Sequence, residues 1–168
     1  MQNKKAAGAK SEVTYFVFHI LEELFAIEID RVINVLEMSD PTPVPETPDY
    51  LEGIINVRGE LLPVVNARAK FGMPQPPFSK DACILLLEIH ARQEQFRLGL
   101  MVDRADDVIG IPDEKLEQIP DMGLNMNPDY VKAAFNREQD IIFVLDIDEI
   151  FSHKQVTEIK ELKEQQKG

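Results

Sequence analysis

The chain has 168 residues and a mass of 19.1 kDa, which excludes a large multidomain enzyme and favours one compact unit. Its formal net charge of −12 argues against nucleic acid as a partner, because a protein that binds a phosphate backbone needs a basic face. Hydrophobic residues make up 44% of the chain, so the sequence can bury a core and differs from that of a disordered polymer.

Cysteine content and hydropathy predict a cytoplasmic protein. Cys83 is the only cysteine, which rules out an internal disulfide and a thiolate zinc cage. No run of the sequence reaches the ~18 apolar residues that a membrane-spanning helix needs, and no apolar run follows the N-terminal lysines. We therefore expect a reducing compartment and no direct insertion into a membrane.

The two ends of the chain differ from the strand-rich middle. Residues 1–12 are expected to form a disordered tail, and residues 152–168, rich in Lys, Glu and Gln, a charged tail or a short helix. After the first tail, the aromatic and β-branched run 15–20 and the alternating run 25–29 flank Glu22-Glu23. This pattern predicts a β-hairpin.

The segment after this hairpin is predicted to form one or two helical turns. Val32, Val35 and Leu36 have helical spacing, and Asp30 stands where a capping side chain would be. Four prolines between residues 41 and 48 cannot continue a helix or lie in a central strand. An extended connector is therefore expected there.

Two more hairpins are predicted downstream. Within residues 50–65, two apolar runs flank Arg58-Gly59, where the glycine supplies the positive φ of a two-residue turn. Strands are predicted at residues 82–89 and 96–102, around a polar turn.

The chain also repeats itself. An offset of 80 residues aligns Tyr50 with Tyr130, and an offset of 73 aligns Asp30-Arg31 with Asp103-Arg104. Each copy is predicted to hold a strand pair, a helical turn, a connector and a second strand pair. Copies this short favour small closed β-barrels, because closure removes the exposed edges of short strands.

No motif for catalysis or cofactor binding is found. The sequence has no P-loop and no Gly-x-Gly-x-x-Gly after a strand. His19, His90 and His153 lack metal-ligand spacing, and the first two are expected to be structural. Cys83 lies in an apolar run and is predicted to be a buried small residue rather than a nucleophile. We therefore expect no catalytic residue, no metal and no cofactor.

The acidic clusters are interpreted as structural. The segment Asp146–Glu149 has the alternating acids of a calcium loop but lacks its glycine, so these residues are predicted to begin a helix. Asp103, Asp106 and Asp107 are interpreted in the same way.

Arg58 differs from the other charged residues because it occupies a hairpin tip between apolar strands, where a long cation must project outward. It is either an ordinary surface charge or a contact residue. The second copy of the repeat has Glu138 at this position, so the two halves are not interchangeable.

The string Gly-x-x-Asn-x-Arg-Gly-x-x-x-Pro from Gly53 to Pro63 resembles the central motif of the CheW family of chemotaxis coupling proteins. Supporting matches are the Pro-Thr-Pro-Val-Pro run at 41–45 and the segment Gly99–Asp103. The resemblance extends over residues 13–151, nearly the whole chain.

The resemblance implies an all-β fold with short helices, made of two SH3-like five-stranded barrels packed side by side at about residues 13–80 and 81–151. It also implies a non-catalytic adaptor that couples methyl-accepting chemoreceptors to the histidine kinase CheA, in arrays beneath the inner membrane. A related chemosensory system such as pilus-driven motility is an alternative, as is an inhibitor that binds CheA alone. A small hydrolase or metal-dependent enzyme would need polar side chains that converge in a pocket.

Contact residues follow from the resemblance position by position. A groove between the barrels is expected to take an amphipathic receptor helix, with apolar anchors for affinity and a charge for register. The alternative for Val32, Val102 and Val108 is barrel core, and the same alternative applies to the kinase-binding positions. The receptor-binding positions are Val32, Asn34, Arg58, Gly59, Met101, Val102, Ala105 and Val108, and the kinase-binding positions are Phe16 and Ile29.

The sequence departs from the family pattern at three places. Ala105 is smaller than the usual β-branched residue, which would reduce any receptor contact there. The segment Ala133–Arg137 lacks a glycine that is common in the family, and Asn66-Ala67-Arg68 replaces the usual Asp-Leu-Arg. None of these changes involves Arg58.

Overall fold

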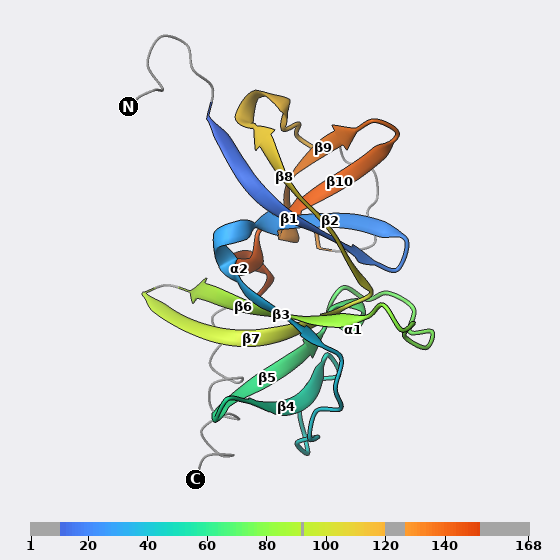
Figure 1. Ribbon diagram of the computed structural model, residues 1–168, viewed down its shortest axis with the longest axis vertical. Helices are drawn as coiled ribbons and strands as arrows, with labels where there is room; N and C mark the ends of the chain where they lie inside the picture. The colour runs from blue at the N-terminus through green and yellow to red at the C-terminus, as the bar shows by residue number, and fades with distance from the viewer. Residues whose placement is uncertain (1–10, 92, 120–126, 152–168) are drawn as a thin grey trace.

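The computed structural model describes residues 11–91, 93–119 and 127–151, most of which lie in β-strands. Ten strands form two five-stranded sheets, one above the other in Figure 1, with two short α-helices between them. The prediction of an all-β fold with two SH3-like units is confirmed. The predicted tails lie outside the described residues, apart from Ser11 and Glu12, and Glu12 already belongs to the first strand.

The upper sheet in Figure 1 has the strand order β8-β1-β2-β10-β9. β2 and β10 run parallel, whereas the other neighbours are antiparallel. The strands are β1 (Glu12–Ile20), β2 (Glu23–Glu28), β8 (Arg104–Pro112), β9 (Val131–Arg137) and β10 (Asp140–Leu145).

The lower sheet has the order β3-β6-β7-β5-β4, again with one parallel pair, β5 and β7. Its strands are β3 (Val32–Glu37), β4 (Leu51–Val57), β5 (Glu60–Asn66), β6 (Cys83–Ala91) and β7 (Glu94–Val102).

Short helical segments connect the strands or follow them. Asn66 and Asp146 cap α1 and α2, each accepting a hydrogen bond from the backbone N–H three residues later. The interpretation of Asp146 as an acid at a helix N-terminus is therefore confirmed. The segments are η2 (Ile29–Arg31), α1 (Ala67–Lys70), η3 (Asp113–Lys115), η4 (Pro128–Tyr130) and α2 (Ile147–Ile150).

Each sheet takes strands from both copies of the repeat. The first copy gives β1 and β2 to the upper sheet and β3 to β5 to the lower one, and the second copy gives β6 and β7 to the lower sheet and β8 to β10 to the upper one. The predicted boundary at residues 80 and 81 therefore does not separate the two sheets. The repeat is real, but its copies exchange hairpins instead of folding separately.

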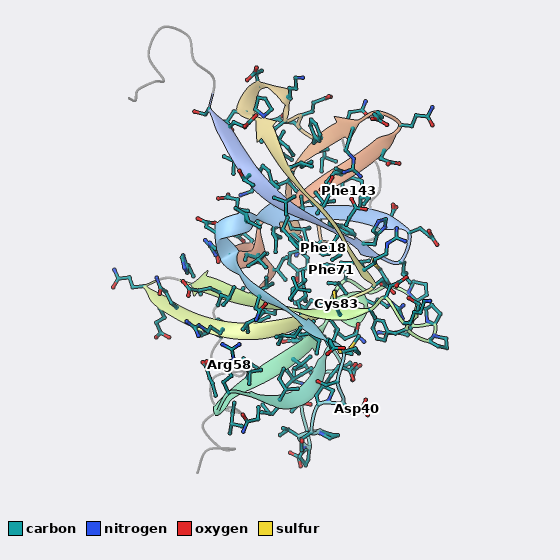
Figure 2. All side chains as sticks on the ribbon, in the orientation of Figure 1. Phe18, Asp40, Arg58, Phe71, Cys83 and Phe143 are labelled. Atoms are coloured by element: carbon teal, nitrogen blue, oxygen red, sulfur yellow. The ribbon has the colours of Figure 1, made fainter. Side chains whose placement is uncertain are left out.

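A core shared by the two sheets explains the consecutive apolar residues in the buried parts of four strands. Along β1, β2, β6 and β7, successive side chains alternate between the inside of their own barrel and the core between the two sheets. Both faces of the buried parts of these strands are therefore covered. In Figure 2, Phe18, Phe71 and Cys83 follow one another between the sheets. The prediction that Cys83 is buried is confirmed.

Each sheet is closed by one isolated β-bridge. Thr42 pairs with Ile54 of β4 through two backbone hydrogen bonds of 2.9 Å, and Glu117 pairs with Ala134 of β9 through two of 2.8 Å. Gly53 lies beside the first bridge with φ +148°, and a Cβ there would be 2.2 Å from the Thr42 carbonyl oxygen. Each bridged connector pairs with one residue of an edge strand, β4 or β9, and so covers part of that open edge.

The helical turn predicted for residues 30–36 is wrong. Only Ile29–Arg31 is helical, without a side-chain cap, and β3 begins at Val32. The β-branched residues Val32, Ile33 and Val35 favour a strand, and pairing with β6 outweighs the apparent helical spacing. The equivalent segment of the second copy is β8, so Asp106 and Asp107 lie in a strand rather than at a helix start.

Candidate partner-binding surface

β3 and β8 are edge strands that occupy equivalent positions in the two sheets. Each strand starts near the boundary between the two sheets; in Figure 1, β3 runs downward and β8 runs upward. Of the predicted receptor-binding residues, Asn34 on β3 and Ala105 and Val108 on β8 are exposed, and Val32 is half-buried against the shared core. These strands therefore present four of the eight predicted positions.

Sequence reasoning missed that two apolar residues of β3 are exposed. Ile33 and Val35 are 41% and 42% exposed, and Val108 is 52% exposed. Val35 and Val108 are repeat equivalents, so each edge strand presents a valine at the same place. The β-branched residues of segment 30–36 indicate a strand, in which alternate side chains can face outward. The interpretation of this segment as a helix overlooked that indication.

A side chain covers the open edge of each of these strands. The Asn34 side-chain oxygen accepts a hydrogen bond from the Val35 backbone N–H at 2.8 Å, and the Asp107 carboxylate accepts one from the Val108 N–H at 2.8 Å. Bonding of these N–H groups within the chain discourages strand-to-strand association at the edges. Asn34 thus shapes the edge in addition to being exposed.

Arg58 and Gly59 form the two-residue turn between β4 and β5, at the end of the lower sheet (Figure 2). Both residues have positive φ, 52° and 88°, which defines a type I′ turn and goes beyond the prediction of a positive φ at glycine alone. The Asn56 side-chain oxygen accepts the Gly59 N–H at 2.8 Å and stabilises the turn. Arg58 is exposed and makes no ion pair with any residue that the structure describes.

Three predicted contact residues are buried, and for two of them the alternative assignment to the core applies. Phe16 and Val102 belong to the shared core, with 8% and 0% exposure, and Met101 lies inside the lower sheet. Ile29 in η2 is half-buried against the shared core. These side chains can support a binding surface, but Phe16, Met101 and Val102 offer almost no area to a partner.

The turn region of the upper sheet carries ion pairs where the lower sheet has apolar residues. Asp106 of β8 bonds to His19 of β1 and to Arg137 of β9, both at 3.2 Å. Burial raises the pKa of Asp106, but the hydrogen bonds from His19 and Arg137 outweigh burial and hold this pKa below its usual range. Asp106 and Arg137 are the repeat equivalents of Ile33 and Val57, so only the lower sheet leaves this region apolar.

Asp106→Asn should reduce the loss of folding stability in acid. A carboxylate whose pKa is lower in the folded state stabilises the fold above its unfolded pKa of about 3.9, and this contribution disappears as the pH falls through the folded pKa. Denaturant unfolding between about pH 5 and pH 2 measures the difference. An unchanged pH dependence in the variant would contradict the role given to these hydrogen bonds.

A second apolar surface, which the sequence did not reveal, lies at the β9–β10 hairpin. Ile141 is 53% exposed and borders a shallow hollow with Phe135, Phe143 and Ile119. Five consecutive apolar residues, Ile141 to Leu145, form most of β10, and a run of this kind does not show which of them faces outward. The exposure of Ile141 was therefore missed, and the pattern of β10 was used only to support the repeat.

Neither a metal-binding cluster nor a membrane-spanning helix is found among the residues that the structure describes. No group of three or more His, Cys, Asp or Glu residues in these ranges could hold a metal ion. His19 and His90 bond to Asp106 and Glu88, and burial raises the pKa of the Cys83 thiol, which disfavours the nucleophilic thiolate. Within the described ranges, no helix has the length and hydropathy of a membrane span.

A family model described as the CheW-like domain matches residues 14–155. Chemotaxis protein CheW of Thermotoga maritima is 32% identical over 157 residues, which cover 92% of this chain and 98% of that protein. The crystal structure of the scaffolding protein TtCheW from Thermoanaerobacter tengcongensis matches with a TM-score of 0.75 and 29% identity, covering 86% of this chain and 91% of that chain. Protein PilI of Pseudomonas aeruginosa is 28% identical and covers 73% of this chain and 66% of its own length.

These matches cover nearly all of the chain and agree with its two-sheet fold. The family is one of non-catalytic scaffolds, and the prediction that this chain is not an enzyme is confirmed on that basis. The resemblance found at the Gly53–Pro63 motif is confirmed in the same way. The chain therefore belongs to the CheW-like family and is a scaffold protein of chemotaxis.

Proposed function

We propose that this protein couples methyl-accepting chemoreceptors to the histidine kinase CheA. The observation that carries the proposal is the pair of exposed edge strands β3 and β8 with their apolar side chains, together with the exposed cation Arg58 at the β4–β5 turn, which makes no ion pair with the described residues. Membership of the CheW-like family supports a role as a bridge between signalling proteins. The bridge works in the cytoplasm, at receptor arrays beneath the inner membrane.

The receptor side of the bridge is an amphipathic helix from the cytoplasmic tip of the receptor. Val32, Val35 and Val108 supply apolar contact area, and each apolar Å² removed from water stabilises the complex by roughly 25 cal/mol before the cost of association is subtracted. Arg58 pairs with an acidic residue of the receptor and sets the register of the helix. Because Arg58 is exposed at a rigid turn and has no ion pair among the described residues, it can attract an acidic partner to this place.

The kinase side uses the surface around η2. Ile29 is half-buried there and offers part of its side chain, whereas Phe16 supports this region from the core. A charged substitution of Phe16 is a poor test of kinase contact, because it would place a charge among Phe18 and other core residues. Ile29→Lys in a variant that remains folded is the better test.

Reconstitution tests the proposed coupling directly. Receptor fragments in a lipid-templated array and purified CheA should give receptor-controlled kinase activity only when this chain is added. The control is the same mixture with the Arg58→Glu variant, which keeps the kinase-binding region. If kinase activity in the array does not depend on the wild-type chain, the proposed function is wrong.

A related chemosensory system is the second candidate. The 28% identity to protein PilI favours it, but that match covers 73% of the chain, against 92% for the Thermotoga maritima chemotaxis protein. Binding to receptor and kinase fragments from the flagellar system and from another chemosensory system of the same organism would separate the two candidates. Preference for the flagellar pair is the expected result.

A further inference from the structure

Two ion pairs lie at the two places where the chain crosses between the sheets. At the first crossover, between β2 and β3, Arg31 donates to both carboxylate oxygens of Asp148 in α2, at 2.8 and 2.6 Å. At the second, between β7 and β8, Asp103 accepts from Arg68 of α1, with the Nε bond at 3.1 Å. Each crossover is thereby tied to a helix that follows a strand of the sheet that the chain is leaving, α2 after β10 and α1 after β5.

Each of the two aspartates also bonds to the opposite sheet. Asp103, which leaves the lower sheet, accepts the backbone N–H of Leu21 at the β1–β2 turn at 2.7 Å. Asp148, which follows the upper sheet, accepts the backbone N–H of His90 in β6 at 2.8 Å. The two carboxylates therefore hold a crossover, a helix and a strand end of the other sheet in one arrangement.

These pairs are more shielded than an ordinary surface ion pair. The side chains of Arg68 and Asp103 are 3% and 15% exposed, and those of Arg31 and Asp148 are 21% and 30% exposed. Arg68 is further fixed by a hydrogen bond to the Pro76 carbonyl and by the Phe78 ring, 4.0 Å from its guanidinium carbon. Shielded two-point pairs between arginine and carboxylate have a defined geometry as well as strength.

The signs of the two pairs are reversed between the copies of the repeat. Both crossovers contain the dipeptide Asp-Arg, but the first uses Arg31 and the second uses Asp103. The helix partners, Arg68 and Asp148, are repeat equivalents with opposite charge. If the helices exchanged places, like charges would meet at both crossovers, so the sign pattern also specifies which helix joins which crossover.

We propose that Arg31–Asp148 and Arg68–Asp103 are positioning pairs that fix the two sheets relative to each other and thereby set the surface formed by β3 and β8. Val32 follows Arg31 directly, and Ala105 stands two residues after Asp103, so each edge strand begins at one of these pairs. A partner that contacts both strands binds well only if the position of β3 relative to β8 is fixed. This inference rests on the proposed receptor-binding function.

The test separates the spacing of the sheets from receptor binding. Asp148→Asn keeps an oxygen that accepts the His90 N–H but removes the charge that pairs with Arg31. Lys132→Gln is the matched control, because the Lys132–Glu28 pair, at 2.9 Å, joins two strands of the upper sheet only. Nitroxide labels at the exposed positions Thr14 in β1 and Gln95 in β7, in a Cys83→Ala background, report the distance between the sheets.

Asp148→Asn should broaden the distribution of distances between the sheets and weaken binding to a receptor fragment about fivefold, whereas Lys132→Gln should change neither. A distribution as narrow as that of the wild type would overturn the inference, and so would a broadened distribution with unchanged receptor affinity. If Asp148→Asn does not fold, Arg31→Lys gives the same test, because lysine keeps the charge but loses the two-point geometry.

The failure of the proposed function would look different. A wild-type chain that does not bind receptor fragments contradicts that function, whereas the distance measurement is unaffected. In that case a broadened distribution in Asp148→Asn still supports the structural role of the pair, and an unchanged one overturns it.

Discussion

Gly53→Ala should destabilise the protein by about 3 kcal/mol, because the lower barrel cannot close around a Cβ at this position. The new atom would lie 2.2 Å from the carbonyl oxygen and 2.6 Å from the carbonyl carbon of Thr42, and both are backbone atoms that cannot rotate away. The φ of +148° adds backbone strain for any residue except glycine. Either the Thr42–Ile54 bridge breaks or the start of β4 shifts.

Denaturant unfolding of Gly53→Ala and of a matched control measures this effect. Gly110→Ala is the control, because its Cβ would meet only the end of the Glu12 side chain, at 2.8 Å, and this flexible group can move. The control should stay within about 0.5 kcal/mol of the wild type. Equal stability losses in the two variants would show that barrel closure at Thr42 is not the cause.

Arg58→Glu should weaken receptor binding by at least about tenfold and leave folding unchanged. The side chain projects from a type I′ turn without an ion pair among the described residues, so charge reversal breaks no ion pair among them. It replaces attraction with repulsion at the acidic residue proposed for the receptor. Titration of a receptor fragment, with circular dichroism to check the fold, measures the effect.

The repeat offers a matched control for this experiment. Glu138 occupies the equivalent turn of the upper sheet, also with positive φ, and Glu138→Arg reverses a charge in the same local geometry. This control should bind the receptor fragment with wild-type affinity. Opposite changes of affinity in the two variants would indicate a general effect of net charge, because the two substitutions change it in opposite directions. No loss in Arg58→Glu would contradict the role of Arg58.

The sequence predicted the strand pairs better than their assembly. Hairpins at residues 15–29 and 50–65 are local, since alternation and turn residues specify them within about 15 residues. The exchange of hairpins between the two copies depends on which distant strands meet, such as β2 with β10 and β5 with β7. The local pattern of the two similar copies is compatible with two separate barrels and with barrels that exchange hairpins, so the sequence did not distinguish these arrangements.

The candidate surface was predicted in part for the same reason. The exposure of Arg58 could be predicted because a cation at the tip of an apolar hairpin is a local feature, and Arg58 is exposed in the structure. Burial of Phe16 and Val102 comes from the core that the two sheets share, which no single strand reveals. Ile33 and Val35 were overlooked because three apolar positions in a short segment fit a helical period as well as a strand.

The core that the two sheets share has a consequence for how the molecule unfolds. A chain of two autonomous barrels would melt in two steps, and one barrel could open while the other kept its shape. Here side chains of β1 and β2 in the upper sheet pack in one cluster with side chains of β6 and β7 in the lower sheet, so the loss of either barrel would expose apolar side chains of the other to water. We therefore expect the two barrels to melt together in a single transition.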